Sequence, residues 1–168
     1  MPSILIDAII DALAAYLVPF VGGVPIVRGQ VNRVPMPQGA FVELTEILTV
    51  DLSVPYAGYD TVLGTAILHG PARIDIQVDF YGPVAGDYCK AAMTAFRTGW
   101  GFDAFPTDIK PLYMSDGAQS PLITGEQQYE TRWTLTASMQ YNPTVSVPQQ
   151  FANALAVNIV NVERAYPA

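Results

Sequence analysis

The segment from Tyr129 to Tyr141 constrains the fold most, because apolar and polar side chains alternate along nearly all of it. Alternation with a period of two predicts a β-strand with one buried face and one polar face. A strand over the whole segment would be about 40 Å long at about 3.3 Å per residue, which is more than most domains need. Asn142-Pro143 marks its end. The apolar side carries Tyr129, Trp133, Leu135, Ala137, Met139 and Tyr141, with Thr131 as its weak member, and the polar side carries Glu130, Arg132, Thr134, Thr136, Ser138 and Gln140.

Three other segments also favour strands. Arg73 to Phe80 alternates cleanly, with Ile74, Ile76, Val78 and Phe80 on one face and Arg73, Asp75, Gln77 and Asp79 on the other. Phe41 to Leu52 is rich in β-prone residues and has apolar side chains on both faces, which predicts considerable burial. Ala154 to Val162 alternates and then changes phase at Val160, so a bulge or a helix there are both compatible with its pattern.

Two segments predict amphipathic helices. The first runs from Ile4 to Val18 before Pro19, and the second begins at Gly82-Pro83 and ends near Gly99. Asp7 and Asp11 lie four residues apart on the polar side of the first helix. The expected apolar stripes are Ile4, Leu5, Ala8, Ile9, Ala12, Leu13, Tyr16 and Leu17 in the first helix, and Val84, Tyr88, Ala91, Ala92, Ala95 and Phe96 in the second.

These elements predict an α+β fold in which two helices pack on a largely antiparallel β-sheet. Proline and glycine occur throughout the chain, so we expect a single domain over residues 1–168 and no internal linker. The passages Pro19 to Ala40, Tyr56 to Gly70 and Gly101 to Gly125 are rich in turn-forming residues and are expected to be loops.

Charge excludes some classes of function. The chain has a formal net charge of -7, and only 14% of its residues are charged although 51% are hydrophobic. Disordered chains have low hydrophobicity and a high proportion of charge, which is the opposite of this composition. An acidic surface is also repelled electrostatically by DNA and by anionic membranes. The first apolar segment lacks the basic start of a signal peptide, and Asp7 and Asp11 oppose its insertion into lipid. We therefore expect a folded acidic protein without a membrane anchor, whose shortage of surface charge needs an explanation.

No constellation of residues indicates catalysis or metal binding. Cys89 and His69 are each the single residue of their type, so a disulfide within the chain or a zinc site with several Cys/His ligands is excluded, and a reducing cytoplasm is expected. Asp75 and Asp79, with Glu43 and Glu46 on another strand, offer carboxylates for acid–base chemistry. Carboxylates on a solvated or interfacial strand face are the favoured interpretation. A small acidic hydrolase stays a distant alternative, and no cofactor is expected.

Tyrosines point instead to protein contacts. Tyr56, Tyr59, Tyr81, Tyr113, Tyr129, Tyr141 and Tyr166 mostly fall beside turns or strand ends. A ring with a polar tip suits a protein–protein interface, although each tyrosine alone suits a core edge equally well. Burial of surface between subunits would also explain the shortage of charge.

The order of several short segments resembles the phage neck or tail terminator proteins. The similarity covers roughly residues 30 to 165. Its segments are RVPMPQGAFVELT at 33–45, IQVDFYGP at 76–83 with TAFRT at 94–98, PLY at 111–113 with PLITGEQQYETRWTL at 121–135, and QYNP at 140–143 with PQQF at 148–151.

This resemblance implies a structural virion protein and not an enzyme. Its subunits would form a hexameric ring that caps the tail tube and presents a surface to the head–neck connector, while DNA passes through the lumen without specific binding. The protein would be made in the cytoplasm of the bacterial host and reside in the neck or tail of the virion. A tail-tube or head–tail connector subunit is the runner-up within the same class.

A ring requires two different patches to meet head to tail. The long strand could add a free edge to a neighbouring sheet, and the loops could reach across the subunit boundary. Arg33 to Gly39 and Gly117 to Gln128 are the expected contact segments. Arg132 is expected to pair with a carboxylate, and a partner in the same subunit, such as Glu43 or Asp75, is slightly favoured over a neighbour's. The candidate interface residues are Arg33, Pro35, Pro37, Gln38, Tyr113, Glu126, Gln128 and Arg132.

Overall fold

The computed structural model describes residues 2–30, 37–120, 122–123, 129–150 and 152. Its helices are α1 (Ile6–Leu17), α2 (Ala85–Phe96) and α3 (Gly99–Asp103), with a 3-10 turn, η1, at Val18–Phe20. Its strands are β1 (Ile26–Arg28), β2 (Phe41–Asp51), β3 (Tyr56–Asp60), β4 (Thr65–His69), β5 (Ala72–Tyr81), β6 (Ile109–Met114), β7 (Ala118–Gln119), β8 (Leu122–Ile123), β9 (Tyr129–Glu130), β10 (Arg132–Tyr141) and β11 (Thr144–Pro148).

The main sheet has the order β1-β2-β5-β10-β6, with β7 also pairing with β10. All of its pairs are antiparallel except β1 with β2. Strand β5 lies at the centre and pairs with β10 along its whole length, from Ala72 opposite Tyr141 to Tyr81 opposite Arg132. Strand β10 is therefore interior, with both edges occupied. The expectation that this long strand offers a free edge to a neighbour is wrong, because β6 and β7 fill that edge.

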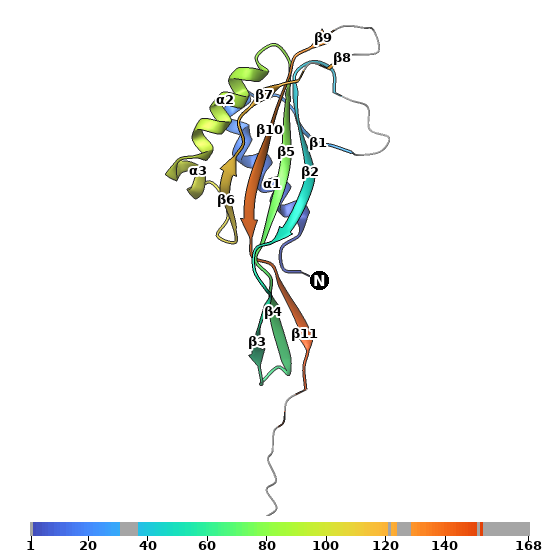
Figure 1. Ribbon diagram of the computed structural model, residues 1–168, viewed down its shortest axis with the longest axis vertical. Coiled ribbons are helices and arrows are strands. Elements are labelled where there is room, and N and C mark those ends of the chain that lie inside the picture. The colour runs from blue at the N-terminus through green and yellow to red at the C-terminus, as the bar shows by residue number, and fades with distance from the viewer. Residues whose placement is uncertain (1, 31–36, 121, 124–128, 151, 153–168) are drawn as a thin grey trace, which may run out of the picture.

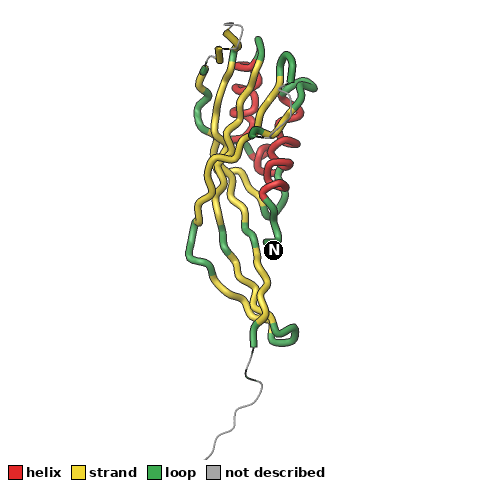
Figure 2. Tube along the Cα trace, turned by 90° about the vertical axis from the view of Figure 1, so that its right-hand side faces the viewer, coloured by secondary structure: helices red, strands yellow, loops and turns green. Residues whose placement is uncertain are grey.

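Helices α1 and α2 cover one face of the main sheet and leave the other face without a helical layer (Figure 2). The core lies between these two layers. The side chains of the alternating face of β5 are fully buried there, and so are those of β10 from Leu135 to Met139. Tyr16 of α1 donates a hydrogen bond to the carbonyl oxygen of Ala92 in α2 at 2.6 Å, which joins the two helices. The largest fully buried side chains are Phe41, Phe80, Ile9, Leu13, Leu17, Leu44, Ile74, Ile76, Met114, Leu135, Met139 and Val21.

Beyond this body, three strands form a narrow extension that we call the arm, comprising residues 52–70 and 143–150. Its sheet has the order β11-β4-β3 and is antiparallel throughout. Along the chain, β2 of the body leads into β3 of the arm, β4 of the arm leads back into β5, and β10 leads into β11. The arm therefore prolongs the long axis of the molecule (Figure 1). None of the described helices lies against the arm in either view (Figures 1 and 2).

The predicted α+β class is confirmed, and most of the predicted strands and helices form. Strands β2 and β5 lie within a residue of the expected bounds, and β10 ends at Tyr141, directly before Asn142-Pro143. The two predicted helices are α1 and α2. Asp7 and Asp11 do face outward, where Arg28 lies 2.7 Å from the Asp7 carboxylate and 3.9 Å from that of Asp11. The domain bounds 1–168 stay a prediction.

The buried stripes of the helices differ from the predicted ones. Helix α1 buries Ile10, while Leu5 is half exposed and Ala8 lies on the surface. Helix α2 buries Ala85, Cys89 and Met93, but Val84 and Ala91 face outward. The physical reason is that each helix packs on the sheet with its buried face rotated about the helix axis from the predicted one. No described helix is both long and apolar enough to cross a membrane.

Three predicted loops contain regular structure. Tyr56 to Gly70 is the β3–β4 hairpin, Gly101 to Gly125 includes β6, β7 and β8, and Pro19 to Ala40 includes β1. These strands are short, and pairing with β10, β2 or each other stabilises them more than their own composition does. The predicted strand from Tyr129 is divided into β9 and β10 at Thr131, the weak member of its pattern. The segment Ala154 to Val162 lies outside the described residues.

Candidate interaction surfaces

Asp79 lies on the central strand β5, on the sheet face that no helix covers, and it is only 1% exposed. Its carboxylate accepts hydrogen bonds from Arg132 Nε at 3.1 Å and Nη2 at 2.8 Å. Thr134 Oγ1 and Gln77 Nε2 also donate to it. These hydrogen bonds raise the pKa of Arg132, whose guanidinium also lies 5.6 Å from the centre of the Tyr81 ring. Arg132 thus pairs within its own subunit, as favoured, but with Asp79 instead of the expected Glu43 or Asp75.

Asp75 is likewise buried and engaged. It accepts a hydrogen bond from Ser138 Oγ at 2.7 Å and one from Arg73 Nη2 at 3.1 Å. The expectation of a solvated or interfacial carboxylate face is therefore wrong for Asp75 and Asp79, because the long side chains of β5 and β10 close over them. Each carboxylate forms an ion pair with an arginine on the same sheet face, Asp75 with Arg73 and Asp79 with Arg132. In the described part of the chain, no group of three or more His, Cys, Asp or Glu side chains could hold a metal ion.

The tyrosine at the end of β5 has a similarly internal role. Tyr81 donates a hydrogen bond to Glu43 Oε2 at 3.2 Å and stacks on Phe41 with 4.2 Å between the ring centres. Burial raises the pKa of Tyr81 to about 12, and the nearby carboxylates of Asp79 and Glu43 act in the same direction. Tyr81 and Tyr141 are buried, so these two rings belong to the core and not to an interface.

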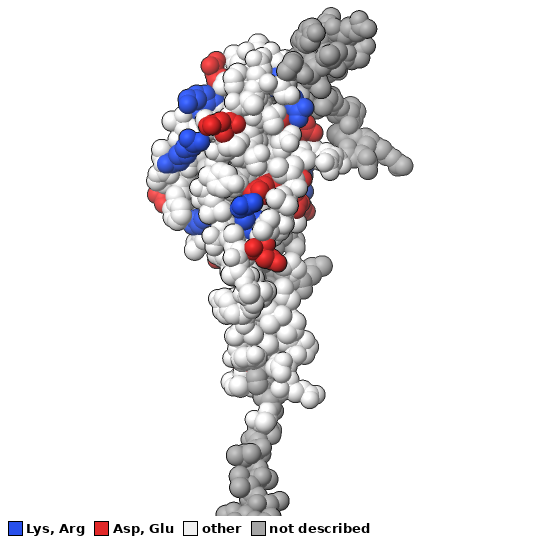
Figure 3. Space-filling view, in the orientation of Figure 1, with Lys and Arg blue, Asp and Glu red and all other residues white. Residues whose placement is uncertain are grey.

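The arm carries the exposed apolar side chains of the molecule's narrow end. Val54 is 87% exposed, and at the hairpin tip Val62 is 92% and Leu63 is 72% exposed. Asp60 is the one Asp, Glu, Lys or Arg in residues 52–70 and 143–150, and its carboxylate accepts hydrogen bonds from the backbone N–H groups of Val62 and Leu63. Charged side chains gather on the body, whereas the arm is uncharged in the view of Figure 3.

His69, expected in a loop, is the last residue of β4. Its ring stacks on that of Tyr56 in β3, with 4.6 Å between centres and 4° between planes. Tyr56 remains 59% exposed. The pair forms a flat aromatic surface at the base of the arm, which suits a protein contact better than it suits chemistry.

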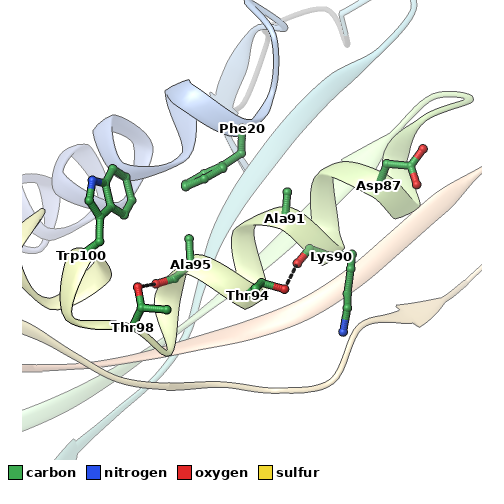
Figure 4. A pocket seen from close by; sticks show the side chains of 8 residues that line it. All are labelled: Phe20, Asp87, Lys90, Ala91, Thr94, Ala95, Thr98 and Trp100. Carbon is green, nitrogen blue, oxygen red and sulfur yellow. Dashed lines mark hydrogen bonds between the residues drawn. The ribbon is translucent and has the colours of Figure 1, made fainter.

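A second apolar surface lies on the outer side of α2. An open hollow of about 610 Å³ is lined by Phe20 of η1, Ala91 and Ala95 of α2, and Trp100 of α3, which is half exposed (Figure 4). Thr94 and Thr98 also line it, but their hydroxyls donate to the carbonyl oxygens of Lys90 and Ala95 in the same segment. The hollow therefore offers mainly apolar contact, with Asp87 and Lys90 among its lining residues.

The structure places four of the predicted interface residues. Pro37 and Gln38 precede β2, and Gln38 is exposed. Tyr113 is 49% exposed on β6, opposite Ser138 of β10. Arg132 is engaged by Asp79. These residues are spread along the sheet, and no hydrogen bond or ion pair found among the described residues joins them into one cluster. Arg33, Pro35, Glu126 and Gln128 lie outside the described residues.

Sequence reasoning missed the arm as a surface. The signal was present in residues 52–70, where valine, leucine, isoleucine and tyrosine recur beside a single acidic residue. The glycines at 58, 64 and 70 favoured a loop over the hairpin. In that hairpin Gly64 adopts a φ of +62°, a conformation suited to glycine in a tight turn.

The chain was compared with protein-family models, curated proteins and solved structures. The model of the phage neck terminator protein family matches residues 7–164. Among solved structures, the chain is similar to the sheath/tube terminator of an extracellular contractile injection system, PVC, in its extended state. The TM-score is 0.60 at 13% identity, over 99% of this chain and 66% of that chain, so this chain spans just under two thirds of that protein's length. No curated protein matches.

Proposed function

This chain belongs to the phage neck terminator family, and from that premise we propose that six copies form a ring that caps the tail tube. The other side of the ring joins the head–neck connector, and DNA passes through the lumen. The role is that of a structural virion protein in the neck or tail, made in the cytoplasm of the bacterial host. The similar solved structure is itself a terminator, which supports this role.

The observation that carries the proposal is the apolar arm, whose single charged side chain is that of Asp60. Monomeric soluble proteins rarely expose a contiguous apolar surface of this kind, and such surfaces mark sites of protein contact. The most exposed arm side chains, Val54, Val62 and Leu63, have no neighbouring layer in the described part of the chain that could bury them. A subunit that meets other proteins on assembly needs such a surface.

The charge of the chain supports passage of DNA without attachment. A net charge of -7 repels the phosphate backbone, so an acidic ring would not hold DNA as it moves. The polar sheet face supports a structural role too, since Asp75 and Asp79 are both occupied by arginine and hydroxyl donors. A hydrolase would need at least one of these carboxylates available to a substrate.

Assembly on tails tests the function directly. A phage with a stop codon in this gene should produce tails that do not join heads, and adding the purified protein to the lysate should restore infectious particles. Electron microscopy should then show one ring at the head-proximal end of each tail. Long tubes formed by the protein alone would indicate a tail-tube subunit, and rings attached to heads instead of tails would indicate a connector. Either result would contradict the proposal.

Stoichiometry is tested separately by native mass spectrometry of the purified chain. A closed species of six copies is expected. A strict monomer at high protein concentration would argue against a preformed ring.

A further inference from the structure

Both faces of the arm sheet carry partly exposed apolar side chains. Ile67 and Leu68 are neighbours in β4, so their side chains point to opposite faces of the sheet. They are 36% and 37% exposed although β4 is the central strand. The order β11-β4-β3 makes β3 and β11 the two edge strands. The arm therefore has two open faces and two strand edges that could continue the sheet.

The outer edge of β11 can be located from its contact with the N-terminal segment. Ser3 N–H donates to the carbonyl oxygen of Thr144, and Thr144 N–H donates to Ser3 Oγ, both at 2.9 Å. The backbone groups of Thr144 thus point away from β4. Because backbone groups alternate in direction along an antiparallel strand, those of Ser146 point outward as well. No outward hydrogen bond of Ser146 is found among the described residues.

The same alternation locates the outer edge of β3. His69 lies opposite Thr144 on one side and opposite Tyr56 on the other. Since the Thr144 groups point away from β4, the His69 groups point toward β3 and pair with Tyr56. The backbone groups of Ala57, the next residue, consequently point away from β4. In the described part of the chain, Ala57 also has no outward backbone partner.

Neither edge carries the charged side chains that usually prevent strand addition. Exposed edge strands are commonly protected by lysine, proline or inward-pointing charge. Strand β3 has no lysine, arginine or proline, and β11 has no charged residue. On the outer edge of β11, Ser3 bonds to Thr144 and Pro148 lacks an N–H group, so Ser146 is the outward residue that presents both backbone groups. Asp60, at the end of β3, is turned into the hairpin by its hydrogen bonds to Val62 and Leu63.

We propose that adjacent copies meet through the arm, with the β3 edge of one copy pairing with the β11 edge of the next; this rests on the ring proposed above. Strands β3 and β11 both run antiparallel to β4, so they share one direction. Rotation about an axis along the strands preserves that direction, and the neighbour's β11 therefore arrives beside β3 as a parallel partner. The contact joins two different edges head to tail, as a ring requires.

The distribution of charge favours contact between copies of this chain through the arm over contact through the body. Two chains of net charge -7 repel each other through their bodies, where the acidic side chains lie. The arm contributes a single carboxylate, which is occupied by its own turn, so arm-to-arm contact avoids this repulsion. Each copy also supplies both halves of the contact, and no other protein is needed to complete it.

Disulfide cross-linking tests this arrangement. In a parallel pair, a residue whose backbone groups bond to the partner strand lies opposite a residue whose backbone groups point to the other side of its own strand. The backbone groups of Ala57 point outward and those of Val145 and Val147 point toward β4, so Ala57 would lie opposite Val145 or Val147 of the neighbour. Two double variants are made in the full chain, Ala57→Cys with Val145→Cys and Ala57→Cys with Val147→Cys. Within one chain these positions lie on strands separated by β4, about 9.5 Å apart, which is too far for a disulfide. Cross-links therefore report contacts between copies.

Native Cys89 does not interfere, since it is 2% exposed and burial raises its thiol pKa to about 11. After mild oxidation, one double variant should give a ladder of covalent multimers on a non-reducing gel, reaching six copies. Each single-cysteine variant should give no species above a dimer. If wild-type rings form but neither double variant gives a ladder, the arm proposal fails while the ring stands. Absence of both rings and ladders overturns both proposals.

A charge at the edge provides an independent measurement. Ser146→Lys places a lysine on the outer strand, where it opposes strand addition, and Thr107→Lys adds the same charge at an exposed position of the body. Ser146→Lys should convert most of the ring to monomer without changing the far-ultraviolet circular dichroism spectrum, and Thr107→Lys should leave the ring intact. Equal ring populations in the two variants would overturn the proposal.

Discussion

At the scale of single residues, Asp79 links three side chains on the sheet face that no helix covers: Gln77, Arg132 and Thr134. This burial decides what the carboxylate can do. A buried carboxylate that is satisfied by a guanidinium stabilises the register of β5 against β10, and it has no lone pair directed at solvent for acid–base chemistry.

Replacing Asp79 by alanine should therefore destabilise the fold strongly. Asp79→Ala leaves Arg132, a quarter exposed in its side chain, without its partner, and we expect a loss of about 3 kcal/mol in the free energy of unfolding. Urea denaturation measures this loss. The matched control is Asp116→Ala, whose carboxylate is 94% exposed and lies 3.5 Å from Arg97; it should cost less than about 1 kcal/mol. Similar costs for the two variants would contradict the structural role of Asp79.

Ionisation of Cys89 should lower the stability of the folded protein at alkaline pH. Burial raises its pKa from 9.0 to about 11, so the folded state holds the thiol proton more tightly than the unfolded state. This contribution is fully present below about pH 9 and is lost as the pH rises toward about 11. Unfolding free energies of the wild type should fall more steeply across this interval than those of Cys89→Ala. Parallel pH profiles would show that the thiol ionises as easily in the folded chain as in the unfolded one.

At the scale of elements, the junction of α2 and α3 depends on close backbone approach. Gly101 of α3 is buried, and a Cβ there would lie 2.5 Å from the carbonyl oxygen of Ala95 and 2.9 Å from the Cα of Phe96. Both atoms belong to the backbone, so they cannot move aside as a flexible side chain would. A side chain at residue 101 would therefore push the short helix that carries Trp100 away from α2.

Gly101→Ala should separate α3 from α2 and cost about 1–3 kcal/mol, as overpacking generally does. Gly99→Ala in the same helix is the control, because a Cβ there meets nothing within 4 Å. Thermal unfolding of both variants compares them, and the fluorescence of Trp100 should change only in Gly101→Ala. If Gly101→Ala unfolds at the wild-type temperature, the close approach does not limit stability.

Elements also differ in how well their sequences predicted them. Strand β5 was predicted because Ile74, Ile76, Val78 and Phe80 alternate without interruption. The β3–β4 hairpin was not predicted, because the arm has apolar side chains on both faces and glycines interrupt the pattern. Alternation arises when one face is buried and the other is wet, and a sheet without a core layer lacks that asymmetry. The resemblance to the terminator family covered the arm but did not indicate its structure.

At the scale of the whole molecule, charge and apolar surface are separated along the long axis. Among the described residues, charged side chains gather on the body (Figure 3). The arm instead exposes valine and leucine side chains. Contacts made through such an arm are hydrophobic and backbone-mediated. Their strength should respond little to ionic strength, unlike contacts between charged bodies.

Raising NaCl from about 0.1 M to about 1 M shortens the Debye length from about 10 Å to about 3 Å. We expect the mass of the assembled protein, measured by light scattering, to stay constant or to rise, because repulsion between the acidic bodies is screened. Dissociation at high salt would show that ion pairs hold the copies together, and it would contradict assembly through the arm.

The sequence alone determined the class of the fold, the main strands and helices, and the family to which the chain belongs. Local periodicity and ordered short motifs carry that information. Only the tertiary structure decided that β10 is interior, that Asp75 and Asp79 are buried, and that β3 and β11 are the outer strands of the described arm sheet. Strand order is set by pairing between residues far apart in the sequence. A strand's own pattern records which of its faces is buried but not which of its edges is occupied.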